Sequence, residues 1–251
     1  MAKLRKNLIR IQGSIGDLNF YERNGVLFVR KKGGGFNAEA IQNKKSMEPV
    51  RQNASEFGEC SRTKRHYQHK LDWFYENFRD GTLHGRLMRL FTKIKNLDKV
   101  SPRGKRKVYR GLETAEGRQL FEQFVYTPKC RIGHRLGGRI QFDKISRSVF
   151  IGGLIFSEKL YPKGATHLEL SLTVVDFDFR NNKGGIHPVK TLRIPKGEIP
   201  SEMNMVFEEL PVKSGMELVF LSLRFYQEAG GRSYYHQRQN VGLELIGALW
   251  G

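Results

Sequence analysis

Hydrophobic residues near the N-terminus form two short runs, Leu18–Tyr21 and Val26–Arg30, separated by a polar segment that ends in Asn24-Gly25. Asn and Gly both tolerate a positive φ, as the type I′ turn of a two-residue hairpin requires. The pattern therefore predicts a β-hairpin. The three glycines that follow, Gly33–Gly35, indicate a hinge or a close approach of the backbone to another group.

From Ser46 to Phe78 the apolar residues recur at spacings of three and four, which is the period of an amphipathic helix. Ser46 suits the N-cap of this helix, and Pro49 suits its first turn. We predict a helix of roughly seven to eight turns that ends before Asp80-Gly81, with Gly58 as a candidate break.

A second helix is predicted from Leu83 to Leu97, with one apolar face and a basic face that includes Arg86 and Arg89. The short connection between the two helices favours an antiparallel helical hairpin. The basic segment 101–107 contains Pro and Gly, so it is predicted to be a turn or linker at a domain boundary.

Nine segments in the rest of the chain have the β-branched and aromatic content of strands. They are Gln119–Tyr126, Arg139–Phe142, Val149–Phe156, His167–Phe179, Lys190–Ile194, Asn204–Leu210, Glu217–Tyr226, Ser233–Gln237 and Val241–Leu249. Short strands at this spacing favour a sandwich or a barrel. Between Leu168 and Phe179 the apolar residues shift from even to odd positions, which predicts a β-bulge or a strand that bends from one sheet into another.

These elements predict an α+β fold, with an N-terminal β-hairpin and a helical hairpin followed by a C-terminal antiparallel β-sandwich of about seven to nine strands. The predicted domains are a basic arm and β-hairpin at residues 1–45, the helical hairpin at residues 46–104 and the β-sandwich at residues 105–251.

The charge of the chain changes this picture, because it is concentrated in one half. The 251 residues carry a formal net charge of +19. Residues 1–110 contain 26 Lys and Arg against 10 Asp and Glu, whereas residues 111–251 contain 18 against 15. Such a split favours a polyanionic partner for the first half, and nucleic acid above all. The alternative is a solvated basic surface that keeps the protein soluble.

The candidate phosphate-contacting residues fall into groups on the arm, the hairpin, the two helices and the basic segment. They are Lys3, Arg5, Lys6 and Arg10; Arg30, Lys31 and Lys32; Arg62 and Arg65, with Lys64 and Lys70 beside them; Arg86 and Arg89; and Arg103, Lys105, Arg106 and Lys107, with Arg110 beyond them. Lys and Arg at these positions would neutralise phosphates and release counterions.

Aromatic residues alternate with these charges, and Tyr21 and Phe28 on the hairpin are the best placed to stack on bases. The alternative is that the aromatic residues belong to the core, which we expect for Trp73 and Tyr75 at contacts between the helices and a sheet.

Other chemistry has weaker support. Two groups hold candidate metal ligands, Cys60 with His66 and His69, and Cys130 with His134, but both are incomplete for zinc. The pair Asp176 and Asp178 shares one strand face, yet it precedes a turn where solvent-facing Asp is common. No phosphate-loop or nucleophile-elbow pattern occurs. We expect no catalytic residues, no metal and no cofactor.

Several short segments carry a family resemblance. They are Gly13–Tyr21, Asn24-Gly25, Val29–Gly34, Arg51–Gly58, Gly85–Leu87 and Gly104–Arg106. In these segments the chain resembles an uncharacterised family of basic proteins encoded in Bacteroidota genomes, over roughly the first 125 residues. The resemblance implies a bacterial or bacteriophage source, and it carries over no activity, ligand or catalytic residue.

The sequence therefore favours non-enzymatic binding of nucleic acid through phosphates, with little sequence specificity. The competing hypothesis is a structural assembly subunit, such as a virion or shell protein, whose basic layer faces packaged nucleic acid; a ribosome-associated protein is a third. The N-terminus lacks the apolar core of a signal peptide and no transmembrane span is expected, so we expect a cytoplasmic protein or one inside a virion or ribonucleoprotein particle. The β domain could support a homo-oligomer or a larger assembly.

Overall fold

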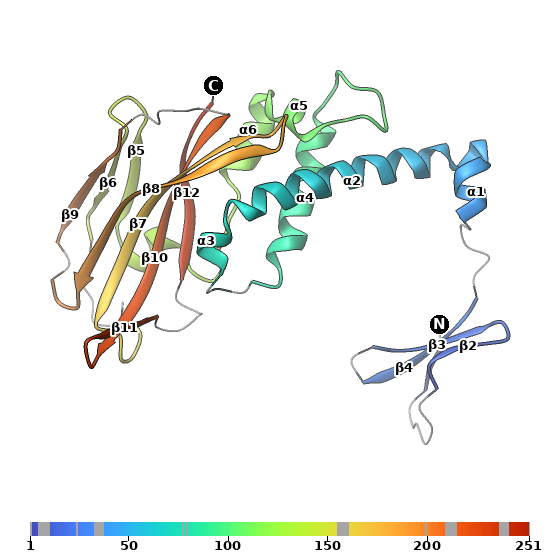
Figure 1. The fold of residues 1–251 in the computed structure, drawn as a ribbon, viewed down its shortest axis with the longest axis horizontal. Coiled ribbons are helices and arrows are strands. Elements are labelled where there is room, and N and C mark those ends of the chain that lie inside the picture. Colours follow the sequence, from blue (N-terminus) through green and yellow to red (C-terminus); the bar gives the residue numbers. More distant parts are fainter. Residues whose placement is uncertain are drawn as a thin grey trace. The chain divides into compact units, whose positions relative to one another are not determined.

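The computed structural model describes residues 2–4, 11–23, 25–32, 38–76, 78, 80–154, 161–198, 200–208, 215–235 and 241–250. The chain divides into two compact units, Met1–Asn53 and Ala54–Gly251. The first unit contains a small sheet, and the second contains most of the helices and two further sheets (Figure 1). Both boundaries predicted from the sequence, after residues 45 and 104, differ from this division.

The first unit is built on a four-stranded antiparallel sheet with the order β1-β4-β3-β2. Its elements are β1 (Ala2–Leu4), β2 (Gly13–Ile15), β3 (Leu18–Arg23) and β4 (Val26–Lys31), followed by α1 (Ala38–Asn43) and the 3-10 turn η1 (Lys45–Met47). The predicted hairpin is confirmed as β3 and β4, in which Tyr21 lies opposite Phe28. Asn24 and the predicted hinge at Gly33–Gly35 lie outside the described residues.

The helices that follow are α2 (Glu48–His69), α3 (Asp72–Tyr75) and α4 (Leu83–Asn96). The two predicted helices are present, but they do not form an antiparallel hairpin, because α2 and α4 run across one another and a third short helix lies between them in the chain (Figure 1). Helix α2 runs through Gly58 without a break, and a Cβ at Gly58 would meet open space. The expectation of one helix as far as residue 78 is wrong, because the chain turns after His69 and resumes as the short helix α3.

Three further helices follow: α5 (Val108–Leu112), α6 (Ala115–Glu122) and α7 (Ile132–Leu136). The predicted strand Gln119–Tyr126 is therefore wrong. The hydroxyl of Thr114 caps α6 by accepting a hydrogen bond from the backbone N–H of Gly117 at 3.0 Å. Helix α5 packs so closely on α4 that a Cβ at Gly111 would lie 1.9 Å from the carbonyl oxygen of Ile94. The cap and this close packing explain why residues 115–122 form a helix rather than the start of a strand.

The remaining strands form two antiparallel sheets. They are β5 (Arg139–Asp143), β6 (Ser148–Gly152), β7 (His167–Asp178), β8 (Lys183–Pro195), β9 (Glu202–Val206), β10 (Met216–Ala229), β11 (Arg232–Tyr235) and β12 (Gly242–Leu249). The larger sheet has the order β11-β10-β7-β8 with β12 beside β10, and the smaller has the order β5-β6-β9. Eight of the nine predicted strands correspond to these, and the α+β class is confirmed.

The larger sheet lies between the smaller sheet and the helices (Figure 1). On one face, Leu170 of β7 and Leu221 of β10 share a core with Val149 of β6. On the other face, Phe177 of β7 shares a second core with Tyr67 of α2. The helices and the β-rich half of the second unit are therefore joined by one hydrophobic cluster.

This two-sided burial explains the shift of apolar phase in β7. Even-numbered residues from Leu168 to Val174 face the smaller sheet, and odd-numbered residues from Val175 to Phe179 face the helices. Strand β7 alternates regularly, so the predicted bulge in this strand is wrong. The register does shift where Leu172 and Thr173 pair with Lys190 and Pro188, but the extra residue is Val189 of β8. None of the helices in the described parts of the chain is both long and apolar enough to cross a membrane.

We expect Phe91→Ala to lower the free energy of unfolding by about 3–5 kcal/mol, because Phe91 is fully buried and its ring lies 5.8 Å from that of Tyr67 and 5.9 Å from that of Phe179. The matched control is Phe57→Ala, which removes a helical phenyl ring that is 61% exposed and should change this free energy by less than about 0.5 kcal/mol. Urea unfolding of both variants measures the difference, and equal losses would contradict the described core.

Candidate nucleic-acid interface

The basic segment after α4 is a fixed loop, because two buried carboxylates bind its backbone. Asp98 is 3% exposed and accepts hydrogen bonds from the N–H groups of Val100 at 3.0 Å, Ser101 at 2.9 Å and Lys107 at 2.9 Å. Burial alone would raise the pKa of Asp98, but these backbone hydrogen bonds outweigh it and lower the pKa. Asp98 therefore ties both ends of the loop together.

The second carboxylate is Glu56 of α2, which is 2% exposed. It accepts hydrogen bonds from the N–H of Gly104 at 2.8 Å, from Nε of Arg106 at 2.7 Å and from Nη2 of Arg106 at 2.8 Å. Lys95 of α4 donates to the same carboxylate. Burial would raise the pKa of Glu56, but these donors lower it from 4.5 to about 2. Glu56 thus joins α2, α4 and the loop in one charged network.

Arg106, predicted as a phosphate contact, is half-buried and is bound to Glu56. Its guanidinium forms a two-pronged ion pair with Glu56 through Nε and Nη2, so part of its hydrogen-bonding capacity stabilises the fold. Lys64 of α2, predicted beside Arg62 and Arg65, is buried, at 8% exposure, and its Nζ lies 2.8 Å from Nδ1 of His84. Burial lowers the pKa of the Lys64 ammonium.

Several other predicted residues do reach the surface around this loop, and we call them the basic loop surface. They are Arg62, Arg65, Arg103, Lys105 and Lys107. Glu59 of α2 holds two of them together, because Oε2 lies 3.0 Å from Nη1 of Arg62 and Oε1 lies 3.0 Å from Nζ of Lys107. The structure thus brings Arg62 of α2 next to Lys107 of the loop.

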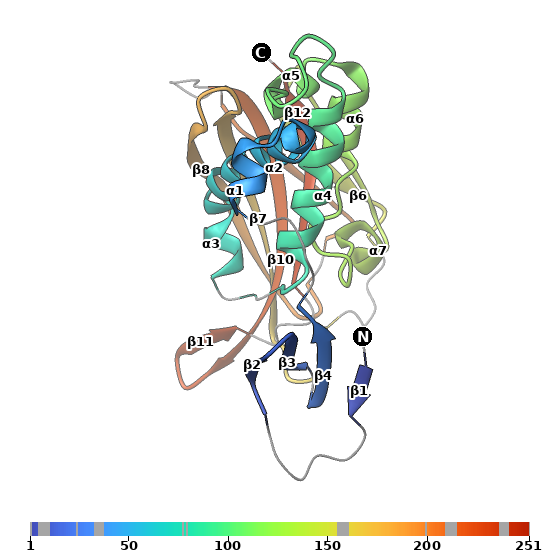
Figure 2. The ribbon, with the colours of Figure 1, turned by 90° about the vertical axis from the view of Figure 1, so that its right-hand side faces the viewer.

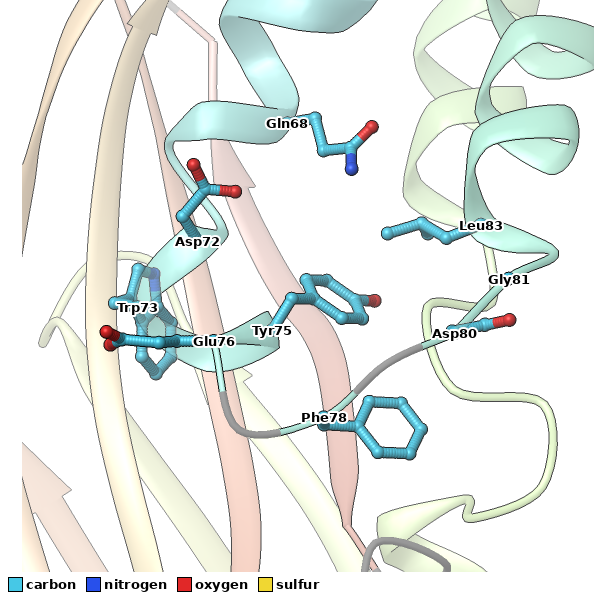
Figure 3. A pocket seen from close by; sticks show the side chains of 9 residues that line it. All are labelled: Gln68, Asp72, Trp73, Tyr75, Glu76, Phe78, Asp80, Gly81 and Leu83. Carbon is cyan, nitrogen blue, oxygen red and sulfur yellow. The ribbon is translucent and has the colours of Figure 1, made fainter.

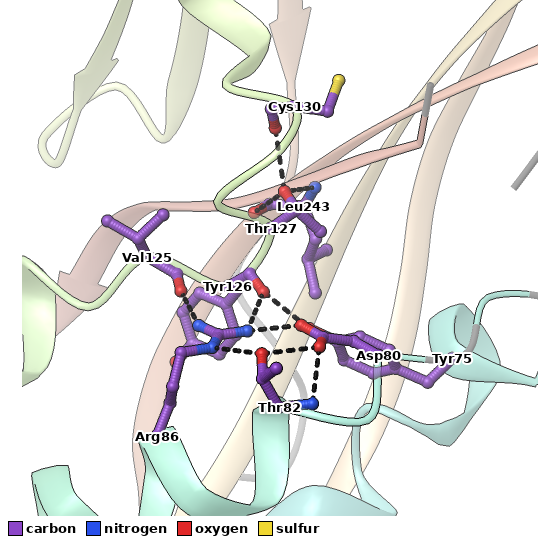
Figure 4. Close-up of polar contacts among 9 residues, drawn as sticks. All are labelled: Tyr75, Asp80, Thr82, Arg86, Val125, Tyr126, Thr127, Cys130 and Leu243. Carbon is purple, nitrogen blue, oxygen red and sulfur yellow. Dashed lines mark hydrogen bonds and ion pairs between the residues drawn. The ribbon is translucent and has the colours of Figure 1, made fainter. Parts of the chain in front are cut away.

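Arg86, also predicted as a phosphate contact, has its guanidinium bound to other groups of the protein (Figure 4). Nη2 donates to Asp80 at 2.6 Å and to the carbonyl of Tyr126 at 2.9 Å, Nη1 donates to the carbonyl of Val125, and Nε donates to Thr82 at 3.1 Å. Arg86 therefore joins the start of α4 to residues 125–126. Arg89, one turn further along α4, is exposed as predicted for a binding residue.

In the first unit, the hairpin carries both aromatic rings and charges on its surface. The rings of Tyr21 and Phe28 stack across the strands with centroids 5.6 Å apart and planes 16° apart. The guanidinium of Arg30 lies 5.8 Å from the centre of the Tyr21 ring, and Arg30, Lys31 and Lys32 are exposed. Lys3 pairs with Phe28 through the backbone of β1, whereas Arg5, Lys6 and Arg10 lie outside the described residues.

A hollow of about 640 Å³ is lined by the end of α2, by α3 and by the start of α4 (Figure 3). Trp73 and Tyr75 line it, and both also pack on the helix–sheet core. The described lining residues include the carboxylates of Asp72, Glu76 and Asp80 and no Lys or Arg. This charge disfavours a phosphate, so the hollow does not belong to the proposed interface.

The weaker candidates for chemistry have structural partners. Among the described residues there is no cluster of three or more potential metal ligands. Cys60 is buried and its Sγ lies 3.8 Å from the carbonyl oxygen of Phe91. Asp176 accepts a hydrogen bond from the N–H of Gly215 at 2.9 Å, and Asp178 accepts one from the N–H of Arg180 at 2.7 Å. These side chains stabilise turns and packing.

Comparison with family models, with curated proteins and with solved structures gave no match.

We expect Glu56→Gln to lower the free energy of unfolding by about 3–5 kcal/mol at pH 7, because it leaves Lys95 and Arg106 without their counter-charge in a buried position. The control is Glu59→Gln, three residues away on α2, which affects partly exposed ion pairs and should cost about 1 kcal/mol or less. Urea unfolding measures both. Equal effects would show that Glu56 does not anchor the loop.

The pH dependence of stability should follow the same carboxylate. The pKa of Glu56 is lower in the folded protein, so its ionised form stabilises the fold above pH 4.5, and this contribution is lost as the pH falls toward about 2. A shift from 4.5 to about 2 corresponds to about 3 kcal/mol, of which about 2 kcal/mol is lost by pH 3. The difference in unfolding free energy between the wild type and Glu56→Gln should shrink accordingly between pH 6 and pH 3.

Proposed function

We propose that this protein binds nucleic acid without catalysing a reaction, by contacting phosphates through the basic loop surface. The observation that carries this proposal is the anchoring of the loop. Glu56 and Asp98 bind its backbone through hydrogen bonds, and Arg103 and Lys105 of the same loop are exposed. A preorganised set of cations loses less conformational entropy on binding than a mobile tail.

The buried acids and the cations that pair with them largely cancel, so the basic excess of the chain remains at the exposed surface. Glu56 is paired with Lys95 and Arg106, and Asp98 accepts hydrogen bonds from the loop backbone. Cations remain at the surface on α2 and on the loop. Binding through phosphates depends on such charge, is strongly weakened by salt and carries little sequence information.

The alternative remains a structural assembly subunit, such as a virion or shell protein, whose basic layer faces packaged nucleic acid. One observation favours self-association. Strand β11 at the edge of the larger sheet exposes Tyr234 and Tyr235, which are 52% and 54% accessible to solvent. Edge strands with exposed aromatic residues are suited to pairing with another copy. Size-exclusion chromatography with light scattering distinguishes the two proposals, because a binding protein elutes as a monomer or dimer and a shell protein as a closed particle.

The phosphate contacts are tested by the triple variant Arg65→Glu, Arg103→Glu and Lys105→Glu. We expect the slope of log affinity against log salt for a 30-base-pair duplex to fall by about 2–3, with at least a tenfold (~1.4 kcal/mol) loss of affinity at 0.1 M salt. Fluorescence anisotropy titrations at several salt concentrations measure both quantities.

The matched control is Lys144→Glu, Lys163→Glu and Lys190→Glu, which changes the net charge by the same amount at exposed positions outside the basic loop surface. It should retain most of the salt slope. An equal loss in both triple variants would mean that net charge alone drives binding, and an absence of binding by the wild type at low salt would exclude the proposed function.

A further inference from the structure

Helices α4 and α6 pack side by side (Figure 2). A second hollow is lined by α4, by α6 and by the segment that follows α6. It has a volume of about 340 Å³, within the range of sites for small ligands. Its lining residues are Arg86, Arg89, Leu90, Lys93, Leu120, Gln123, Phe124, Val125 and Pro128. All of them belong to the second unit, and no carboxylate is among the described residues that line the hollow.

The two walls of this hollow differ in chemistry. On α4, Arg89 and Lys93 lie one turn apart and are exposed, and neither has a polar partner among the residues that the structure describes. On the other side, Leu120 and Phe124 are half-buried and apolar. A ligand that satisfies both walls must combine a negative charge with a flat apolar group.

The apolar wall is held in place before any ligand binds. The guanidinium of Arg86 lies 5.4 Å from the centre of the Phe124 ring, and the same guanidinium donates to the carbonyl of Val125. The ring of Phe124 also meets that of Tyr126 edge to face, with centroids 4.8 Å apart. Tyr126 is itself fully buried. The orientation of the Phe124 ring is therefore set by the core.

We infer that this hollow binds one unstacked base of a single-stranded nucleic acid, with the base against Phe124 and the adjoining phosphates at Arg89 and Lys93. This inference rests on the proposed function and extends it to a preference for single strands. In a duplex the bases are already stacked and paired, so a duplex offers phosphates to Arg89 and Lys93 but no free base face to Phe124. An acidic peptide would satisfy the two cations but would leave the Phe124 wall without a flat partner.

The test measures the affinity of each variant for a 12-nucleotide single strand and for a duplex. The variants are Phe124→Leu and the control Phe57→Leu, which replaces a phenyl ring that is 61% exposed on α2. Phe124→Leu keeps an apolar side chain but removes the aromatic face. We expect it to weaken single-strand binding about tenfold and to change duplex binding less than twofold, because stacking on an aromatic ring contributes to single-strand affinity. Phe57→Leu should change neither.

A second readout locates the base directly. A strand that contains 5-iodouracil should photocross-link to the wild type within residues 119–129. Trypsin releases these residues as one peptide, because it cleaves after Arg118 and after Lys129. Phe124→Leu should abolish this cross-link. If Phe124→Leu does not fold, the surface variant Arg89→Gln/Lys93→Gln serves instead, and it should weaken single strands more than duplex and reduce the cross-link.

The outcomes separate this inference from the proposed function. If the wild type binds both nucleic acids, the loop triple variant weakens both and Phe124→Leu changes neither, only the inference fails. If the wild type binds neither, the proposed function fails as well. If an oligoglutamate peptide binds as tightly as the single strand, and depends on Arg89 and Lys93 but not on Phe124, the hollow is a site for acidic peptides and the inference is overturned.

Discussion

The packing of α2, α4 and the basic loop depends on the contacts that the carboxylate of Glu56 makes. This carboxylate is buried, and it brings together Lys95 from α4, Arg106 from the loop and the backbone of Gly104. An ionised group in this position is tolerated because its donors surround it, and each donor is in turn held in place by the carboxylate. Together with Asp98, which binds both ends of the loop, Glu56 fixes the backbone that carries Arg103 and Lys105.

The larger sheet imposes the second constraint, since its central strands are covered on both faces. Strand β7 must supply apolar side chains to the smaller sheet along one part of its length and to the helices along another. That requirement joins the basic helices to the β-rich body through residues such as Tyr67 and Phe177, whose ring centroids lie 5.5 Å apart. The helices are therefore a layer of the second unit rather than a separate appendage.

The proposed interface divides its tasks among different cations. Arg106 and Arg86 stabilise the fold, with Arg86 fixing one wall of the hollow through Phe124. The basic loop surface would supply phosphate contacts, and Arg89 with Lys93 would flank a base. Positive charge in this protein thus has two roles, and only burial and hydrogen bonding distinguish them.

The sequence by itself determined the uneven charge, the hairpin, the extent of α4 and most strands, because these depend on composition and on periodicities within a few residues. Only the tertiary structure decided which cations stay at the surface. The carboxylate that binds Arg106 lies 50 residues away, and the two backbone carbonyls that bind Arg86 lie 39 and 40 residues away, so no local pattern marks these contacts. The same holds for α6, whose helical state depends on a cap and on helix packing, and for the hollow beside α4, whose two walls meet only when the chain folds.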